Sequence, residues 1–352
     1  MHDGTHMSLD QLTEAWTRQL VGALADELDA RTRVALIDCP DHGNVGDSLI
    51  ALGELRVLRL LGCRIVHISS AREDCVTALR ALGPDVPILI HGGGNFGDLW
   101  PSHQTLRETL AREYRDRTVV QLSQSIHFRD GARAEQSAAA LRQHPHFAVW
   151  CRDRESFDKA MALGLRARFV PDMALALGPL RRSTPPRYPV VVVRRTDHER
   201  ADPGAQVAFP AGWHQHDWIG DVPGAGRQRA RRAQARRWLP RAAATMLAER
   251  SLTRIFKARA AGGTDLVSSG AVVLTDRLHV HVLCTLCGIP HGFLDNNYGK
   301  VTSMWRAWTQ PAGLARSFTS WDDAIAWAAV ANVHDHGQTR PAGPSPASPQ
   351  GA

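Results

Sequence analysis

Residues 34–61 read VALIDCPDHGNVGDSLIALGELRVLRLL, and this stretch decides the fold. Its first five residues are an apolar run typical of a buried strand, and leucines recur at helical spacing over residues 48–61. Between them lies GNVGD, residues 43–47, whose glycines permit a tight turn and whose Asp47, or the following Ser48, is placed to cap the helix. A strand, a short turn and a helix in this order predict one unit of a parallel α/β sheet.

The same unit recurs along the chain without any repeated sequence. Such alternation is typical of a doubly wound sheet, and 352 residues suffice for two domains. We therefore predict two Rossmann-like domains, 1–180 and 190–333, joined by a linker, 181–189, and followed by a disordered tail, 334–352. In the first domain the predicted strands are 34–38, 65–68, 86–91, 119–122, 147–150 and 168–170, and the predicted helices are 48–61, 73–82, 105–114, 134–142 and 156–163. In the second domain the predicted strands are 190–193, 271–274 and 289–294, and the predicted helices are 278–287 and 321–330.

Composition limits the classes of protein that fit. Hydrophobic residues make up 43% of the chain and charged residues 22%, which is typical of a globular protein, and there is no uncharged apolar run long enough to span a membrane. Residues 1–10 contain no apolar signal core, so we expect a cytoplasmic protein. The net charge of +7 suits anionic substrates or an anionic membrane surface. Nucleic acid is not expected as a partner, because aromatic residues are only 6% and no recognition motif is present.

The six cysteines mostly fall inside apolar strand and helix patterns, so we expect small core residues in a reducing compartment. Cys284 and Cys287 have the spacing C-x-x-C, with His279 and His281 just upstream. No second pair of ligands follows at zinc-finger spacing. We therefore interpret this stretch as a buried helix face and expect no metal.

Glycine-rich and polar segments follow several predicted strands of the first domain. In an open parallel sheet, ligands bind beyond the carboxyl ends of the strands. Segment 43–47 follows the first strand, at a helix start that favours an anion. Segment 91–98, HGGGNFGD, follows the third strand, and its three glycines let a ligand come close, although it is neither a dinucleotide fingerprint nor a Walker loop. Gln124 and Ser125 follow the fourth strand, and Arg152 follows the fifth.

The second half places a cation and a histidine at one helix start. The segment TDRLH, residues 275–279, lies between a predicted strand and a predicted helix. Arg277 can bind phosphate or carboxylate through two hydrogen bonds, and His279 is close enough to exchange a proton with the bound group. Arg195 and Lys300 follow two other strands of this half, so they would bring further positive charge to the same cleft.

Seven arginines crowd a predicted helix over residues 227–241: Arg227, Arg229, Arg231, Arg232, Arg236, Arg237 and Arg241. One interpretation is a solvated helix face. The other is attraction to anionic lipid or to a lipid diphosphate. The sequence leaves both open.

Taken in chain order, these segments resemble the polysaccharide pyruvyl transferase family, most closely its bacterial exopolysaccharide branch. The resemblance spans about residues 34–301 and rests on segments 43–47, 91–98, 124–125, 152–156, 171–172, 194–199, 275–279 and 295–300. It implies two domains facing a cleft, similar to the GT-B architecture of glycosyltransferases. It also implies phosphoenolpyruvate as the donor substrate, no cofactor, and a sugar acceptor that receives pyruvate as a ketal. We expect that acceptor to be a lipid-linked oligosaccharide, with peripheral contact between the protein and the inner membrane surface.

The resemblance and the chemistry give each candidate residue a role. Transfer needs a proton donor, a base for the sugar hydroxyl, and cations on the phosphate and the carboxylate. His279 suits the acid or base role, because a histidine can give or take a proton near neutral pH, and Asp47 or Asp98 would activate the hydroxyl. The residues expected to bind the donor, in a site of the second domain, are Arg277, Leu278, Arg195, Arg152 and Lys300. The residues expected to bind the acceptor or shape the cleft loops are Asn44, Gly46, Gly93, Gly94, Asn95 and Ser125.

Two other functions are compatible with the sequence. One is a sugar-nucleotide-dependent glycosyltransferase of the same architecture, which would need a nucleotide site in the second half. The other is a non-catalytic protein that binds an anionic glycan, whose basic charge would lie on an open surface. Residues 202–259 carry no motif that would name the sugar or its hydroxyls.

Overall fold

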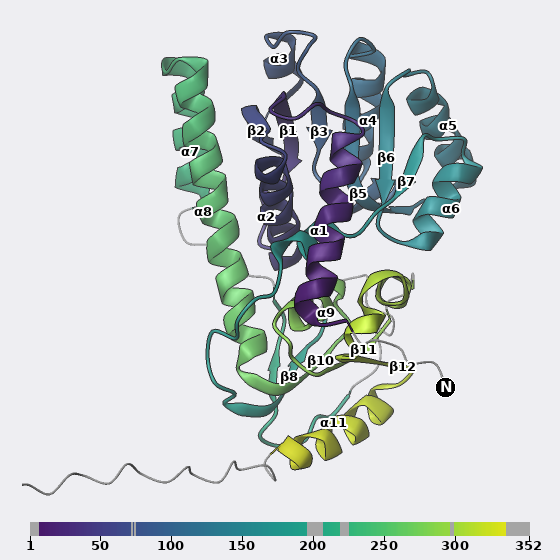
Figure 1. Ribbon diagram of the computed structural model, residues 1–352, viewed down its shortest axis with the longest axis vertical. Helices are drawn as coiled ribbons and strands as arrows, with labels where there is room; N and C mark the ends of the chain where they lie inside the picture. The colour runs from purple at the N-terminus through teal and green to yellow at the C-terminus, as the bar shows by residue number, and fades with distance from the viewer. Residues whose placement is uncertain are drawn as a thin grey trace, which may run out of the picture.

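Two parallel β-sheets, one above the other along the long axis of the molecule, form the framework (Figure 1). The computed structural model describes residues 7–71, 73, 75–195, 207–218, 225–295 and 299–335. Helices pack on the faces of both sheets. The parallel α/β class predicted from the sequence is confirmed.

The first sheet reverses its strand order beside its first strand. Its strands are β1 (Arg33–Cys39), β2 (Arg64–Ser70), β3 (Ile88–Ile90), β4 (Gly93–Gly97), β5 (Val119–His127), β6 (Phe147–Cys151) and β7 (Ala167–Phe169). β1 pairs with β2 on one side and with β3 on the other, and β5, β6 and β7 continue outward from β3. This reversal leaves a crevice at the carboxyl ends of β1 and β3, where ligands of doubly wound sheets bind.

Helices cover both faces of this sheet. They are α1 (Leu9–Ala25), α2 (Val45–Leu60), α3 (Cys75–Arg80), α4 (Pro101–Glu113), α5 (Gly131–Arg142) and α6 (Arg154–Ala162), followed by the 3-10 turn η1 (Met173–Leu177). β1 is buried from its second residue onward, because apolar side chains of the helices meet it from both sides. α2 packs closely on η1, which brings the start of η1 beside the crevice.

The second sheet repeats the topology of the first. Its strands are β8 (Tyr188–Val193), β9 (His214–His216), β10 (Gly270–Thr275), β11 (His291–Leu294) and β12 (Ala315–Phe318), in the order β12-β11-β10-β8-β9. Its reversal therefore lies between β8 and β10. The helices of this half that follow its strands are α9 (Leu278–Leu286), α10 (Lys300–Met304) and α11 (Trp321–Asp335). The carboxyl end of β10 leads directly into α9, so Arg277 and His279 stand at this second crevice.

A helical hairpin from the second half lies against the first sheet. It consists of α7 (Ala225–Trp238) and α8 (Arg241–Ser268), drawn in green in Figure 1. Arg229 lies 3.1 Å from Asp41, and Arg232 and Arg236 lie 3.1 and 2.8 Å from the carboxylate of Glu73. For these three arginines the interpretation as a solvated helix face is wrong, because their charges fix the hairpin to the first half of the chain.

Several elements differ from the sequence prediction. Residues 93–97, expected as a loop, form strand β4, which pairs with β5 from Gly93↔Gln124 to Gly97↔His127. Gly97 has φ +135°, and a Cβ there would lie 1.6 Å from the His127 carbonyl oxygen, so only glycine fits. Helices α1, α8 and α10 and strands β9 and β12 were not predicted. Helix α11 continues to Asp335, and the rest of the predicted tail lies outside the described residues.

The apolar character of α9 agrees with the interpretation of Cys284 and Cys287 as core residues, because both side chains are buried. All six cysteines are free thiols. In the described part of the chain, no helix is long and apolar enough to cross a membrane. Nor do the histidine, cysteine and acidic side chains of that part gather in any group that could hold a metal ion.

A buried histidine pair makes the fold sensitive to acid. His281 Nδ1 lies 2.7 Å from His291 Nε2, and neither side chain is exposed. Burial lowers the pKa of His291 to about 4, and burial together with His291 holds the pKa of His281 well below its usual range. An unfolded imidazole titrates near pH ~6.5, so below that pH the unfolded chain takes up protons that the folded pair refuses.

We therefore expect the free energy of unfolding to fall as the pH is lowered from about 7 to about 5. Burial also lowers the pKa of His67 to about 4, which adds to the loss, whereas His91, whose pKa is raised because Glu54 outweighs burial, opposes it. Urea denaturation at a series of pH values measures the slope. His291→Gln should reduce the dependence of the free energy of unfolding on pH, whereas His146→Gln, at an exposed position, should leave that dependence unchanged. Equal stability of the parent protein at pH about 7 and about 5 would contradict the prediction.

Candidate active site

The crevices of the two sheets meet in one cavity of about 560 Å³. Its walls come from the segments that follow β1, β3, β6, β8 and β10 and from the start of α10. Wider hollows lie elsewhere, on α7 and α8 and beside β2, but they do not touch either crevice. Of the predicted residues, those that line the cavity are Asn44, Asp47, Gly94, Asn95, Arg152, Arg195, Arg277, Leu278, His279 and Lys300.

Arg152 and Lys300 bring positive charge to one point of the cavity from the two halves of the chain. A Cβ on Gly94 would lie 3.5 Å from Arg152 Nη2 and 3.8 Å from Lys300 Nζ, so the missing side chain leaves space beside both cations. Arg152 is buried, and it donates from Nη1 to Asp172 at 2.7 Å and from Nε to Ser125 Oγ at 2.9 Å. These bonds fix the guanidinium, and its Nη2 is left toward the cavity.

Arg277 stands at the N-terminus of α9, as predicted. Its backbone N–H donates to Thr275 Oγ1 at 3.0 Å, and its Nη2 lies 2.6 Å from Asp217 Oδ1. The neighbouring Asp276 accepts a hydrogen bond from the backbone N–H of Arg195 at 2.8 Å, which ties the ends of β8 and β10 together. Burial raises the pKa of Asp276 above its usual value, although Arg195 and Arg277 act in the opposite direction.

His279 lies between Asp172 and the start of α2. Its Nε2 is 3.4 Å from Asp172 Oδ2, and its ring rests on Gly46, where a Cβ would come within 2.5 Å of Nδ1. Burial alone would raise the pKa of the Asp172 carboxyl, but Arg152 and His279 outweigh it and hold that pKa well below its usual range. An ionised carboxylate therefore backs the imidazole, as an orienting group does in acid–base sites. In the sequence, Asp172 stood out only as part of segment 171–172 of the family resemblance.

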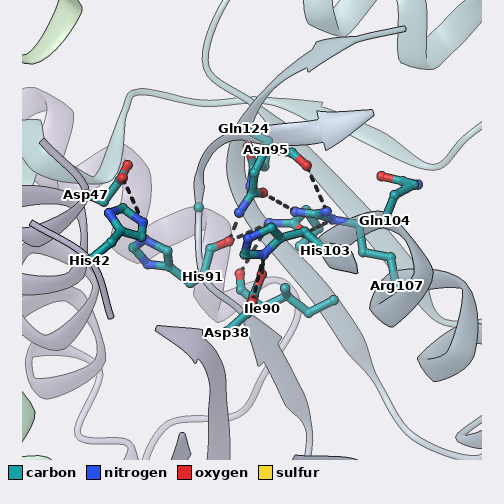
Figure 2. A network of polar contacts seen from close by, with 12 residues as sticks. Asp38, His42, Asp47, Ile90, His91, Asn95, His103, Gln104, Arg107 and Gln124 are labelled. Atoms are coloured by element: carbon teal, nitrogen blue, oxygen red, sulfur yellow. Dashed lines mark hydrogen bonds and ion pairs between the residues drawn. The ribbon is translucent and has the colours of Figure 1, made fainter. Parts of the chain in front are cut away.

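Asp47 keeps its carboxylate at the cavity because another residue caps the helix. Asn44, not Asp47 or Ser48, is the N-cap of α2: its Oδ1 accepts from the Gly46 N–H at 2.9 Å. Asn44 Nδ2 donates to Asp47 Oδ2 at 2.9 Å, and His42 Nε2 lies 3.5 Å from the same oxygen (Figure 2).

The pair formed by His103 and Asp38 was not predicted from the sequence. His103, in the first turn of α4, has its Nδ1 2.8 Å from Asp38 Oδ2, and both residues line the cavity (Figure 2). Asp38 is buried and has φ 62°, an uncommon conformation for a residue other than glycine and one often found at functional sites. The two residues lie 65 positions apart in the sequence, so no local pattern pairs them.

His91 forms a further histidine–carboxylate pair, with Glu54 of α2. Its Nδ1 lies 2.8 Å from Glu54 Oε2, and Glu54 Oε1 accepts from the Gly92 N–H at 2.8 Å. Burial alone would lower the pKa of His91, but Glu54 more than offsets it and raises that pKa. His91 Nε2 is buried and has no hydrogen-bond partner among the described residues. Glu54 thus holds the imidazole in one orientation at the cavity wall.

Asn95 is oriented by a network behind it. Its Oδ1 accepts from Gln124 Nε2 at 2.8 Å and from Arg107 Nη2, and Arg107 Nε donates to Gln121 at 2.6 Å (Figure 2). Burial lowers the pKa of Arg107 to about 10. These hydrogen bonds therefore fix the orientation of the Asn95 side-chain amide at the cavity wall.

Four predicted residues do not line the cavity. Asp98 accepts from the backbone N–H groups of Arg129 and Asp130, at 2.8 and 3.0 Å, so its carboxylate supports the turn before α5. Ser125 donates to Asp153 at 2.6 Å and lies behind Arg152. Gly46 packs under His279, and Gly93 lies beside Asp47. Ser125, Gly46 and Gly93 thus contact residues that line the cavity, whereas Asp98 stabilises a neighbouring turn.

The fold and the cavity together define a class of protein: a two-sheet α/β protein with cations, histidines and carboxylates in its cleft. The same fold occurs in the crystal structure of an uncharacterised protein from Klebsiella pneumoniae, with a TM-score of 0.61 over 87% of this chain and 99% of that chain. The two sequences are 18% identical, so this likeness concerns the fold alone.

The family model for polysaccharide pyruvyl transferase matches residues 44–298. Pyruvyl transferase 1 of Schizosaccharomyces pombe is 33% identical over 292 residues, which cover 78% of this chain and 69% of that protein. EpsO of Bacillus subtilis, named as a candidate pyruvyl transferase, is 27% identical over 303 residues, 83% of this chain and 90% of that protein. The chain therefore belongs to the polysaccharide pyruvyl transferase family, as the resemblance in its sequence indicated, and it is a transferase by family.

Proposed function

We propose that this protein moves pyruvate from phosphoenolpyruvate onto a sugar of an exopolysaccharide repeat unit, as a ketal that bridges two hydroxyls. The observation that carries the proposal is the set of side chains gathered at one cavity. Cations from both halves of the chain line it, together with histidines that are paired with carboxylates of the first half: His42–Asp47, His91–Glu54 and His103–Asp38. Phosphoenolpyruvate is an anion, and a sugar presents hydroxyls. The proposal includes a GT-B-like arrangement, because both sheets turn their crevices to the same cavity.

The donor is expected to bind through arginines and Lys300, without a metal or a cofactor. The space beside Gly94, where Arg152 Nη2 and Lys300 Nζ approach each other, suits one anionic group of phosphoenolpyruvate. Arg277 and Arg195, which line the same cavity together with Leu278, suit the other anionic group of phosphoenolpyruvate. Guanidinium groups bind carboxylate and phosphate through paired hydrogen bonds, so they can supply the charge that a metal would otherwise supply.

The chemistry then needs one acid and one base. His279 would give a proton to C3 of the enol ether, which makes C2 electrophilic, while Asp172 holds the ring. A sugar oxygen would form a bond to C2, and its proton would pass to Asp47 or to the Asp38–His103 pair. The C2–O bond to phosphate would break as the second sugar oxygen bonds to C2, and phosphate would carry away the second hydroxyl proton. Asp98 has no part in this scheme.

The acceptor is expected to enter past Trp100. Its side chain is 43% exposed at the cavity rim, next to Ser102 and His103 of α4. A flat aromatic ring with an apolar face can cover the C–H face of a sugar while polar neighbours bind its hydroxyls. A lipid-linked oligosaccharide at the cytoplasmic face of the membrane would present such a sugar.

Phosphate release tests the proposal directly. The protein is incubated with phosphoenolpyruvate and candidate oligosaccharides in the absence of any nucleotide, and the products are weighed by mass spectrometry. We expect inorganic phosphate together with an oligosaccharide that has gained a pyruvate ketal. A requirement for a sugar nucleotide would favour the glycosyltransferase alternative. Glycan binding with no phosphate release would favour the non-catalytic one.

Arg277→Ala is expected to weaken phosphoenolpyruvate binding at least tenfold. A hydrogen bond to a charged group contributes about 1.5–3 kcal/mol, and Arg277 lines the cavity at the start of α9. Calorimetry measures the affinity, and thermal unfolding checks that the fold is intact. The exposed Arg154→Ala, outside the cavity, is the matched control. Unchanged donor affinity in Arg277→Ala would remove Arg277 from the site.

A further inference from the structure

The turn between α7 and α8 exposes an unusual cluster of large apolar side chains. Trp238 is 71% exposed and Leu239 45%, and one to two turns into α8 Met246 and Leu247 are 48% and 40% exposed. Few large apolar residues are exposed elsewhere in the described part of the chain, and they are scattered. We call these four residues the hairpin tip. Trp238, Leu239 and Leu247 line one groove, and Met246 lines the neighbouring hollow beside β2. Exposed apolar side chains gathered in this way mark a site of interaction.

Arginines border the hairpin tip. Arg231, Arg250 and Arg254 line a groove of about 780 Å³ between the two helices, and Trp238, Leu239 and Leu247 line the same groove. Within the described residues, none of these three arginines forms an ion pair. Glu249 is the single acidic residue between positions 226 and 259 of the sequence. The surface is thus apolar and strongly cationic at once.

The two faces of α7 divide its arginines by helical spacing. Arg229, Arg232 and Arg236, three and four residues apart, point to the first sheet and bind its carboxylates. Arg231, three residues before Gln234 and seven before Trp238, lies on the outer groove with them. The inner arginines therefore fasten the hairpin, and the outer ones remain for a partner.

We propose that the hairpin tip and the outer arginines dock the protein on an anionic membrane surface. Tryptophan and leucine would enter the interface between headgroups and acyl chains, while the arginines would contact lipid phosphates. A nucleic acid would match the arginines but would not draw Leu239, Met246 and Leu247 out of water. The inference deepens the proposed function, because it rests on a lipid-linked acceptor.

The hairpin also connects the docking surface to the cavity. Arg229 binds Asp41, which lines the cavity. Trp238 lies nine residues after Arg229 on the same helix, α7. At about 1.5 Å per residue, roughly 14 Å of helix separates the two positions. A membrane at the hairpin tip would thus lie within reach of an acceptor that is anchored by its lipid.

Vesicle binding by the full chain tests this docking surface. We expect the parent protein to sediment with vesicles of phosphatidylcholine and phosphatidylglycerol and to remain in solution with phosphatidylcholine alone. The triple variant Arg231→Gln, Arg250→Gln, Arg254→Gln should reduce the partition coefficient at least tenfold, and so should Trp238→Ser combined with Leu247→Ser. The control is a triple variant with the same loss of charge at exposed positions of the first half: Arg112→Gln, Arg115→Gln and Arg154→Gln.

Three outcomes would overturn the docking proposal. They are equal binding to both kinds of vesicle, unchanged binding by the groove variant, and an equal loss in the control variant, which would reveal bulk charge alone. A competition assay adds a fourth such outcome: displacement of the protein from vesicles by short duplex DNA at equal phosphate concentration would assign the surface to nucleic acid. Because the assay contains neither phosphoenolpyruvate nor a sugar, its result is independent of whether the protein releases phosphate. Both variants should retain turnover of a soluble oligosaccharide.

Discussion

His279→Gln is expected to lower turnover by roughly 10²–10⁴ on phosphoenolpyruvate and a saturating sugar acceptor, while the donor still binds. Glutamine keeps a polar side chain of similar length but cannot exchange a proton. The imidazole that it replaces is held between the Gly46 backbone and the ionised Asp172, 3.4 Å from its Nε2, so the wild-type ring has one orientation at the cavity. An enzyme that depends on that proton loses the chemical step and not the binding step.

Two measurements separate these steps for His279→Gln. Phosphate release gives the turnover number, and calorimetry gives the affinity for phosphoenolpyruvate. If affinity fell as far as turnover, His279 would be a donor-binding residue. If turnover stayed near that of the parent, the acid would have to be His91 or His103, which also line the cavity. The exposed His146→Gln, far from the cavity lining, should match the parent in both measurements.

The sequence pointed to Arg277 and His279 because their signal is local. A strand end, a helix start, a cation and a histidine coincide within five residues, and the carboxyl ends of parallel strands are where ligands bind. The Asp38–His103 and Glu54–His91 pairs were beyond such reasoning, because their members lie 65 and 37 residues apart. Only the pairing of β1 with β3, and the packing of α2 and α4 beside them, brings each carboxylate to its histidine.

The prediction for Asp98 was wrong in placement for a related reason. A glycine-rich segment has no side-chain period, so its sequence does not tell which residues face the cavity. The pairing of β4 with β5 decides it: Asn95 faces the cavity, while Asp98, past the end of the strand, turns to the backbone of the next loop. Likewise, only tertiary packing reveals that Arg229, Arg232 and Arg236 bind carboxylates of the first half.

The alternation of strands and helices could be predicted because each strand is a short apolar run between helical patterns. Helix α8 was missed because its buried residues face α2, β2 and α9 in turn along 28 residues, so no single apolar stripe marks it. Strands β9 and β12 were missed because their residues are polar and partly exposed at the two edges of the second sheet. Edge strands take their stability from one neighbour and need little apolar sequence.

Gly46→Ala is expected to reduce turnover by about 10² or more, although the substituted atom never touches a substrate. A Cβ at this position would lie 2.5 Å from Nδ1, 2.7 Å from Cγ and 2.8 Å from Cβ of His279. Because the Cβ of His279 is part of the obstruction, rotation of the ring alone cannot relieve it. Either the imidazole leaves its place beside Asp172 or the start of α9 moves away from α2, and both displace the acid from the donor.

The helical position of Gly46 allows a sharp control. Alanine favours helix over glycine by up to about 1 kcal/mol, so helix propensity predicts a gain in stability that opposes the clash. Gly262→Ala in α8, where no atom lies within 4 Å of the new Cβ, isolates that propensity effect and should leave turnover unchanged. In a His279→Gly background the obstruction is gone, so adding Gly46→Ala should then cost little further turnover. If the two substitutions instead lowered turnover independently, Gly46 would act on the helix start and the Asn44–Asp47 pair, and not through the position of His279.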